Sequence, residues 1–134
     1  MKKLFAKKEI FKVKSMPIDP SMMAEPTKGA EYQRRGMAFY ARQQFVSAVS
    51  DLNEAIRLDS RDIDSFYSLG MVYKAMDLKN KAVEAFTQVI NLIRAKADSD
   101  KTKNDMLRRL ALGHINEITQ GDWNLEKEIW HRIA

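Results

Sequence analysis

The stretch IDSFYSLGMVYKAMDLKNKAVEAFTQVINLIRAK, residues 63–96, decides the fold of this 134-residue chain. In its first half, Phe66, Gly70 and Tyr73 follow one another at spacings of four and three residues, which places them on one face of a helix. The pattern breaks near residues 77–79, and a second apolar face then begins. The stretch therefore predicts two helices joined by a tight turn, a helical hairpin. The second face comprises Ala82, Val83, Phe86, Val89 and Ile90.

The same pattern occurs once more, 34 residues earlier in the chain. Six like-for-like matches in a single register are the signature of an internal repeat. Residues 29–62 are therefore predicted to form a hairpin of the same kind. The matched pairs are Tyr32 and Phe66, Gly36 and Gly70, Phe39 and Tyr73, Ala48 and Ala82, Leu52 and Phe86, and Ala55 and Val89.

A third, less regular hairpin is predicted at residues 104–134. One apolar stripe covers residues 107–118 and a second covers residues 125–133, while Gly121 and Asp122 between them provide a helix stop followed by an N-cap residue. Helical repeat arrays need about three units for stability, and their terminal units often depart from the pattern. We therefore expect the third hairpin to cap the array.

At these residues the chain resembles the tetratricopeptide repeat family, whose 34-residue unit carries an aromatic residue, a Leu-Gly pair and a tyrosine on its first helix. The second unit matches at Leu69 and Gly70, whereas the first departs at Arg35, where the family prefers leucine. The resemblance implies an all-α fold in which three antiparallel helix hairpins stack in a right-handed superhelix. We expect one domain over residues 29–134. Its parts are repeat 1 (29–62), repeat 2 (63–97) and the degenerate cap (104–134).

A basic segment and a linker, residues 1–28, precede the predicted repeats. Residues 1–14 contain six lysines and one glutamate, which accounts for the whole net charge of +5 and leaves the rest of the chain neutral. Pro17, Pro20 and Pro26 exclude a regular helix and predict an extended linker. Three interpretations of the basic segment stay open: a disordered arm, a contact surface for acidic membrane or nucleic acid, or a segment that folds back and competes for the groove of the repeats.

Few residues could support catalysis or metal binding. The chain has no cysteine, two histidines (His114 and His131), no Gly-rich phosphate loop and no paired-histidine motif. We therefore expect a protein that is not an enzyme, with no catalytic residue, no cofactor, no metal and no small-molecule substrate. A neutral repeat body disfavours nucleic acid as a partner. No apolar stretch approaches the roughly 20 residues that span a bilayer, and lysines interrupt any secretion signal, so we expect a cytoplasmic protein.

The resemblance also implies a binding surface, because tetratricopeptide arrays bind ligands on the concave face lined by the first helix of each hairpin. Family members that grip the terminal carboxylate of chaperones have asparagine where this chain has Met37 and Met71, so we expect no such clamp. Methionine and tyrosine form an adaptable, amphipathic surface that suits an apolar or helical peptide. The alternative is that both methionines are buried between hairpins. The predicted partner-binding groove comprises Gln33, Met37, Tyr40, Asp64, Tyr67, Met71, Lys74 and His114.

Fold and groove together predict a non-catalytic protein–protein interaction scaffold or assembly factor whose partner is another protein or a peptide. The alternative is a homo-oligomerising structural subunit, for example a homodimer. This alternative rests on the helix expected at residues 122–133, where Leu125, Ile129 and Trp130 would need cover.

Overall fold

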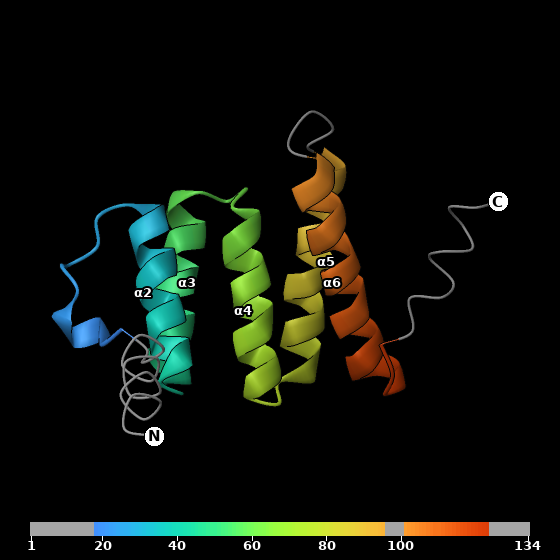
Figure 1. Cartoon of the computed structure of the whole chain (residues 1–134), viewed down its shortest axis with the longest axis horizontal. Coiled ribbons are helices and arrows are strands. Elements are labelled where there is room, and N and C mark those ends of the chain that lie inside the picture. Colours follow the sequence, from blue (N-terminus) through green and yellow to red (C-terminus); the bar gives the residue numbers. More distant parts are fainter. Residues whose placement is uncertain (1–17, 96–100, 124–134) are drawn as a thin grey trace, which may run out of the picture.

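The computed structural model describes residues 18–95 and 101–123, and within these ranges the chain is helical without a strand (Figure 1). The expected all-α fold is confirmed. The elements are the short 3-10 helix η1 (Pro20–Met22) and the α-helices α2 (Gly29–Ala41), α3 (Phe45–Leu58), α4 (Ile63–Ala75), α5 (Lys79–Ala95) and α6 (Lys101–Gln120).

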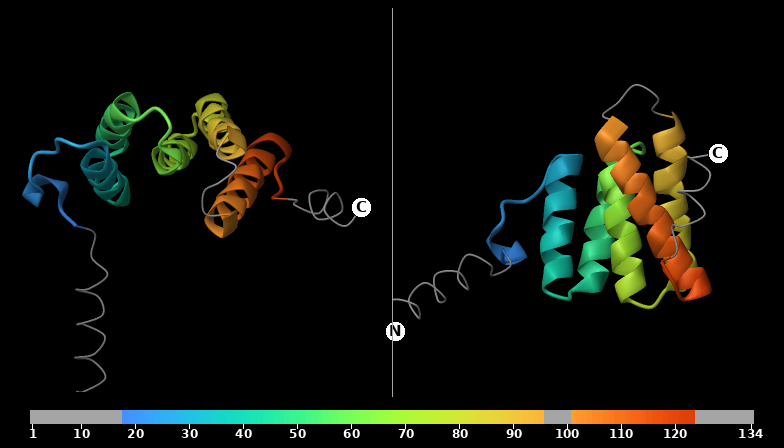
Figure 2. Two further views of the ribbon diagram at one scale, coloured as in Figure 1. Left: turned by 90° about the horizontal axis from the view of Figure 1, so that it is seen from above. Right: turned by 45° about the vertical axis from the view of Figure 1, so that its right-hand side comes forward.

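The helices form a stack of antiparallel hairpins. Helices α2 and α3 pair in the first hairpin, α4 and α5 pair in the second, and α6 packs against α5. Seen from above, α2, α4 and α6 lie in one layer and α3 and α5 lie in the other (Figure 2). The first helix of each unit therefore belongs to the same layer.

Both hairpins turn at equivalent residues. The predicted break near residues 77–79 is confirmed, because α4 ends at Ala75, and its counterpart 34 residues earlier follows the end of α2 at Ala41. In each turn one residue has a positive φ, 61° at Gln43 and 59° at Asp77. These two residues are 34 positions apart, so the repeat extends to the backbone of the turn. The left-handed conformation costs roughly 1 kcal/mol for a residue that carries a Cβ.

Two expected boundaries differ from the structure. The first helix of the third unit begins at Lys101, earlier than the predicted residue 104. The linker, predicted to be extended, contains the turn η1 (Pro20–Met22). A proline is tolerated at the first position of a helical turn, where its missing N–H has no partner to lose. Asp19 completes the turn by accepting hydrogen bonds from the Ser21 amide at 3.0 Å and the Ser21 hydroxyl at 2.8 Å.

Some predictions fall on residues that lie outside the described ranges. These are the basic segment 1–14 with its three interpretations, the second helix of the third hairpin, and the side chains of Leu125, Ile129, Trp130 and His131.

Small residues that repeat at a spacing of 34 sit at close helix contacts. Ala48 and Ala82 are fully buried. A Cβ on Gly70 would lie 2.7 Å from the Phe86 ring, whereas a Cβ on Gly36 would lie 3.0 Å from Cγ of Leu52. The two equivalent glycines therefore allow close helix packing, and the contact at Gly70 is the tighter one.

The apolar core has two parts. One cluster joins α4, α5 and α6 around Phe86 and Val89, which are fully buried. The other joins the two hairpins around Leu52 and Val72, which are also fully buried. Because the second cluster spans α2 to α5, the hairpins pack as one body.

An ion pair joins α2 and α3 at the N-terminal end of the stack. Arg35 on α2 donates to both carboxylate oxygens of Asp51 on α3, at 2.7 and 2.9 Å. Its guanidinium also lies 5.8 Å from the ring centres of both Tyr32 and Phe39, and it bonds Glu25 of the linker at 3.2 Å. These bonds raise the pKa of Arg35, so the side chain stays charged. The linker is thereby fastened to the first hairpin.

Candidate partner-binding surface

All eight residues of the predicted groove lie on the helices of one layer, α2, α4 and α6. Gln33, Met37 and Tyr40 lie on α2, and His114 lies on α6. Helix α4 carries the others, namely Asp64, Tyr67, Met71 and Lys74. The structure therefore brings their helices side by side. The contacts that these residues make within the chain differ from one residue to the next.

Polar contacts between α4 and α6 occupy part of this surface. Lys74 on α4 forms an ion pair with Glu117 on α6, with Nζ and Oε2 3.0 Å apart. Asp64 pairs with Lys103 at 3.3 Å. Sequence reasoning missed Lys103, because the predicted helix began after that residue. Both ion pairs link the second hairpin to α6.

His114 is packed inside the α4–α6 seam, the line of contact between helices α4 and α6. Its side chain stacks on Phe86 with the ring centroids 4.8 Å apart, and Trp123 covers it edge-on at 4.7 Å. The residue is 8% exposed. Burial, together with the nearby charge of Lys74, lowers the pKa of His114 to about 4, so the ring is neutral at pH 7. The histidine itself offers little surface to a partner.

Two side chains of α4 hold the His114 ring by its nitrogens. The Tyr67 hydroxyl oxygen lies 3.1 Å from Nε2, and the Lys74 ammonium lies 3.0 Å from Nδ1. Burial raises the pKa of Tyr67, which therefore keeps its hydroxyl hydrogen at neutral pH. The contact partners are 47 and 40 residues apart in the chain. No local sequence pattern indicates these pairs.

Between α2 and α4 this surface carries the two methionines. Met37 and Met71 are both partly buried. Met71 also packs against the cluster that joins α4, α5 and α6. Tyr40 packs beside Phe45 with ring centroids 6.0 Å apart. The Gln33 amide donates to the Ser68 hydroxyl at 3.3 Å, a contact that the sequence pattern does not reveal. The methionine pair is therefore the part of the predicted groove with the fewest polar contacts.

A pocket of about 310 Å³ adjoins the α4–α6 seam. Four of its lining residues are charged: Lys74, Asp77, Lys79 and Glu117. Two cations and two anions balance one another, so the pocket has no net charge to attract an ion.

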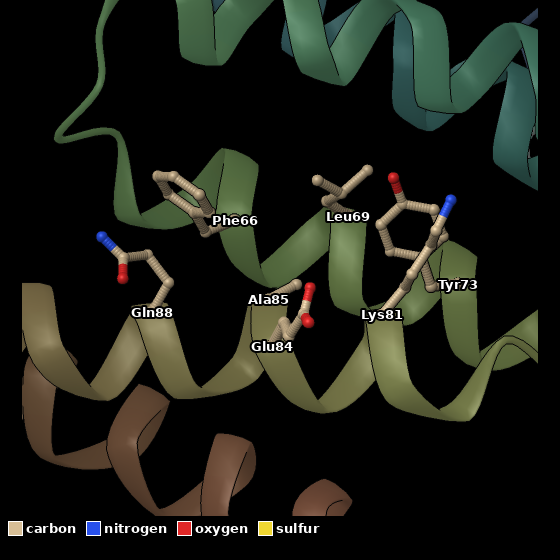
Figure 3. A pocket seen from close by; sticks show the side chains of 7 residues that line it. All are labelled: Phe66, Leu69, Tyr73, Lys81, Glu84, Ala85 and Gln88. Carbon is tan, nitrogen blue, oxygen red and sulfur yellow. The ribbon is translucent and has the colours of Figure 1, made fainter.

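A second pocket lies between α4 and α5 (Figure 3). It measures about 430 Å³, and the Lys81 ammonium at its edge lies 5.6 Å from the centre of the Tyr73 ring. Sequence reasoning missed this pocket, although the aromatic residues 66 and 73 were the available signal. Its lining consists of Phe66, Leu69, Tyr73, Lys81, Glu84, Ala85 and Gln88.

The described residues contain no cluster of three or more His, Asp or Glu side chains arranged to hold a metal ion. Within the same ranges, no helix has the length and apolar character needed to cross a membrane.

Comparison with known proteins adds two family matches and two relatives. The TPR repeat family matches residues 36–77, and the tetratricopeptide repeat family matches residues 63–96. The Hsp70-Hsp90 organising protein of Plasmodium falciparum (isolate 3D7) is 31% identical over 93 residues, which cover 69% of this chain and 16% of that protein. The BBSome complex member BBS4 homolog of Drosophila melanogaster is 26% identical over 87 residues, which cover 65% of this chain and 18% of that protein.

The chain spans less than a fifth of the length of either relative. The matched residues run from Gly36, within α2, to the end of α5, through the helices whose 34-residue register, turn geometry and close glycine contacts repeat. Residues 36–96 of the chain therefore match tetratricopeptide repeat families.

Proposed function

We propose that this chain is a non-catalytic protein-interaction scaffold or assembly factor. In this proposal the face of the α2–α4–α6 layer binds an apolar or helical peptide segment of a partner protein. The observation that carries the proposal is the partial exposure of Met37 and Met71 at equivalent positions of neighbouring helices. Unbranched thioether side chains adapt to varied apolar shapes.

The energetic gain comes from burying apolar side chains of the partner against this pair. Each well-buried aliphatic side chain contributes about 1.5–3 kcal/mol. Tyr40 and Tyr67 flank the methionines and add aromatic surface with a polar end. Asp64 is paired within the chain, so we expect it to shape the surface rather than to bind the partner directly.

The relatives support the class of role. Both are named for multiprotein assemblies, Hsp70-Hsp90 organisation in one case and the BBSome complex in the other. We carry over only the role of a scaffold, because Met37 and Met71 are uncharged and favour an apolar segment over a charged one.

A pull-down with matched variants tests the proposal. The wild type, the double variant Met37→Glu/Met71→Glu and the control Val46→Glu are each used as bait, and the retained proteins are identified by mass spectrometry. Val46 is 76% exposed and lies on α3, in the opposite layer, so the control adds a carboxylate without touching the proposed surface. We expect a partner that the wild type and the control retain and the double variant loses, with at least a tenfold drop in affinity when binding is measured with purified proteins.

Two results would contradict this function. If the double variant retains every protein that the wild type retains, the methionine pair is not the binding surface. If the wild type retains only its own copies and sediments as a dimer, the homo-oligomeric alternative is right. Thermal unfolding of all three baits confirms that each is folded.

A further inference from the structure

The contacts around His114 determine which of its nitrogens carries the hydrogen. A lysine ammonium is a hydrogen-bond donor only, so the Lys74 Nζ that lies 3.0 Å from Nδ1 donates to it. Nδ1 is then an acceptor without a hydrogen. A neutral imidazole carries one hydrogen, which must therefore lie on Nε2. The Nε2–H group, 3.1 Å from the Tyr67 oxygen, donates to that hydroxyl.

This assignment leaves two hydrogen-bond donors free. The Tyr67 oxygen accepts from His114, so its own hydroxyl hydrogen points away from the ring. Lys74 uses one N–H for His114 and one for Glu117, and its third N–H has no acceptor within residues 18–95 and 101–123. Tyr67 is partly buried and the Lys74 side chain is 27% exposed, so neither side chain is closed off from solvent. Met71 lies between them along α4, at helical spacings of four and three residues.

The charge around the two donors selects the kind of acceptor. Glu117 already neutralises Lys74, and the adjoining pocket contains two cations and two anions. A partner carboxylate placed at Lys74 would also meet Glu117, and like charges repel across an interface. A carbonyl oxygen carries no net charge and meets no such repulsion. The two donors therefore suit neutral carbonyl groups.

We propose that Tyr67 and Lys74, oriented by the Nε2–H form of His114, bind neutral carbonyl oxygens of a partner peptide on either side of Met71. His114 is in this scheme a positioning residue. The proposal rests on the proposed function, because it concerns a peptide on the same face, and it adds the chemistry that orients the peptide.

The first measurement needs no peptide. Long-range 1H–15N NMR spectra of the full chain at pH 7 distinguish the two neutral forms of a histidine by their nitrogen shifts. We expect Nε2–H for His114 in the wild type and in the control Lys103→Met, which removes the other α4–α6 lysine contact. In Lys74→Met the constraint on Nδ1 is lost, so the shifts should move toward a mixture of both forms. A hydrogen on Nδ1 in the wild type would overturn the proposal.

The second measurement uses the blocked peptide acetyl-Leu-Ser-Leu-Ser-amide and its free-acid counterpart, titrated at low and high salt. We expect the amide to bind at least as tightly as the acid and with little salt dependence. Tyr67→Phe and Lys74→Met should each weaken amide binding about fivefold, the effect of one hydrogen bond. Tyr73→Phe, which removes a hydroxyl elsewhere on α4, should leave it unchanged.

The outcomes separate this inference from the proposed function. If the peptide shifts the Met37 and Met71 methyl signals but Tyr67→Phe binds it with unchanged affinity, the binding surface stands and the donor pair is rejected. Tighter, salt-sensitive binding of the free acid would reject the neutral acceptor. Absence of any methyl shift with either peptide would count against both the surface and the inference.

Discussion

The two hairpins have the same backbone register. At one pair of equivalent positions, however, the first hairpin has charged side chains and the second has apolar ones. Arg35 and Asp51 occupy, 34 residues earlier, the positions of Leu69 and Ala85. In the first hairpin the pair is a two-bond ion pair. In the second hairpin both residues are apolar, buried, and members of the cluster that joins the hairpins.

The difference follows from what lies next to each position. Leu69 and Ala85 face the first hairpin, so apolar side chains gain from burial there. Arg35 faces the N-terminal linker, where Glu25 adds a further bond and the rings of Tyr32 and Phe39 flank the guanidinium. The comparison teaches that the repeat specifies where side chains meet, whereas the neighbouring segment determines which chemistry is stable at that position.

The largest expected effect comes from breaking the ion pair on one side. Asp51→Ala leaves the guanidinium of Arg35, whose side chain is only 18% exposed, without its main partner. An uncompensated charge of this kind costs about 3 kcal/mol. Denaturant unfolding of the variant should show that loss. The double variant Arg35→Leu/Asp51→Ala copies the second hairpin and should return to within about 1 kcal/mol of the wild type, as replacements of buried ion pairs by apolar residues often do. If the double variant is as unstable as the single one, the two hairpins are not equivalent here.

The second effect concerns His114, the buried polar residue between α6 and the second hairpin. Its pKa is about 4 in the folded chain and 6.5 in its ordinary state, so between these values the unfolded chain binds more protons. The free energy of unfolding therefore rises with pH in this window and falls on acidification, by about 2–3 kcal/mol in total. Urea unfolding at pH 7, 5.5 and 4.5 measures the slope. His114→Gln provides the control and should give a flatter profile. Equal slopes in the two proteins would show that His114 does not carry the dependence.

A third test compares the equivalent glycines. Gly70→Ala places a Cβ against the rigid, fully buried Phe86 ring and should cost about 2 kcal/mol. Gly36→Ala meets Cγ of Leu52 at 3.0 Å, a looser contact than the one at Gly70, and the better helix propensity of alanine, about 1 kcal/mol, should offset that contact. Thermal unfolding of both variants gives the ranking. A larger loss at Gly36 than at Gly70 would contradict the packing described for the two hairpins.

The smallest effect is expected at the turns. Gln43→Gly relieves a left-handed conformation that glutamine tolerates poorly, and should raise the free energy of unfolding by about 0.5–1 kcal/mol. Asp77→Gly should gain less, because aspartate adopts this conformation more readily. Melting temperatures of the two variants compare the turns, and a destabilised Gln43→Gly would mean that its side chain makes a contact worth more than the strain.

Local features of the structure were predictable from the chain. The apolar spacing of residues 63–96 and its repetition predict the helices and the two turns, because helical periodicity and turn formation depend on neighbours within a few residues. The helix that carries each groove residue follows from the same register. The earlier start of α6 was not predictable from the apolar stripe, because its first turn, from Lys101, is polar.

Side-chain partnerships between helices were not predictable in the same way. The departure at Arg35 is visible in the sequence, and its equivalence with Leu69 was a usable signal for the partner Asp51. The contacts of His114 with Tyr67 and Lys74 carry no such signal, since the third unit has lost the strict register.

By itself, the sequence of this chain determined an array of helical hairpins with small residues at the close contacts, because these properties follow from short-range spacing. Only the tertiary structure decided that Lys74 and Tyr67 hold a neutral, buried His114 and that Glu117 balances the lysine. Those contacts depend on how far α6 lies from α4 and on its rotation, which the packing of both helices against Phe86 and the rest of α5 sets.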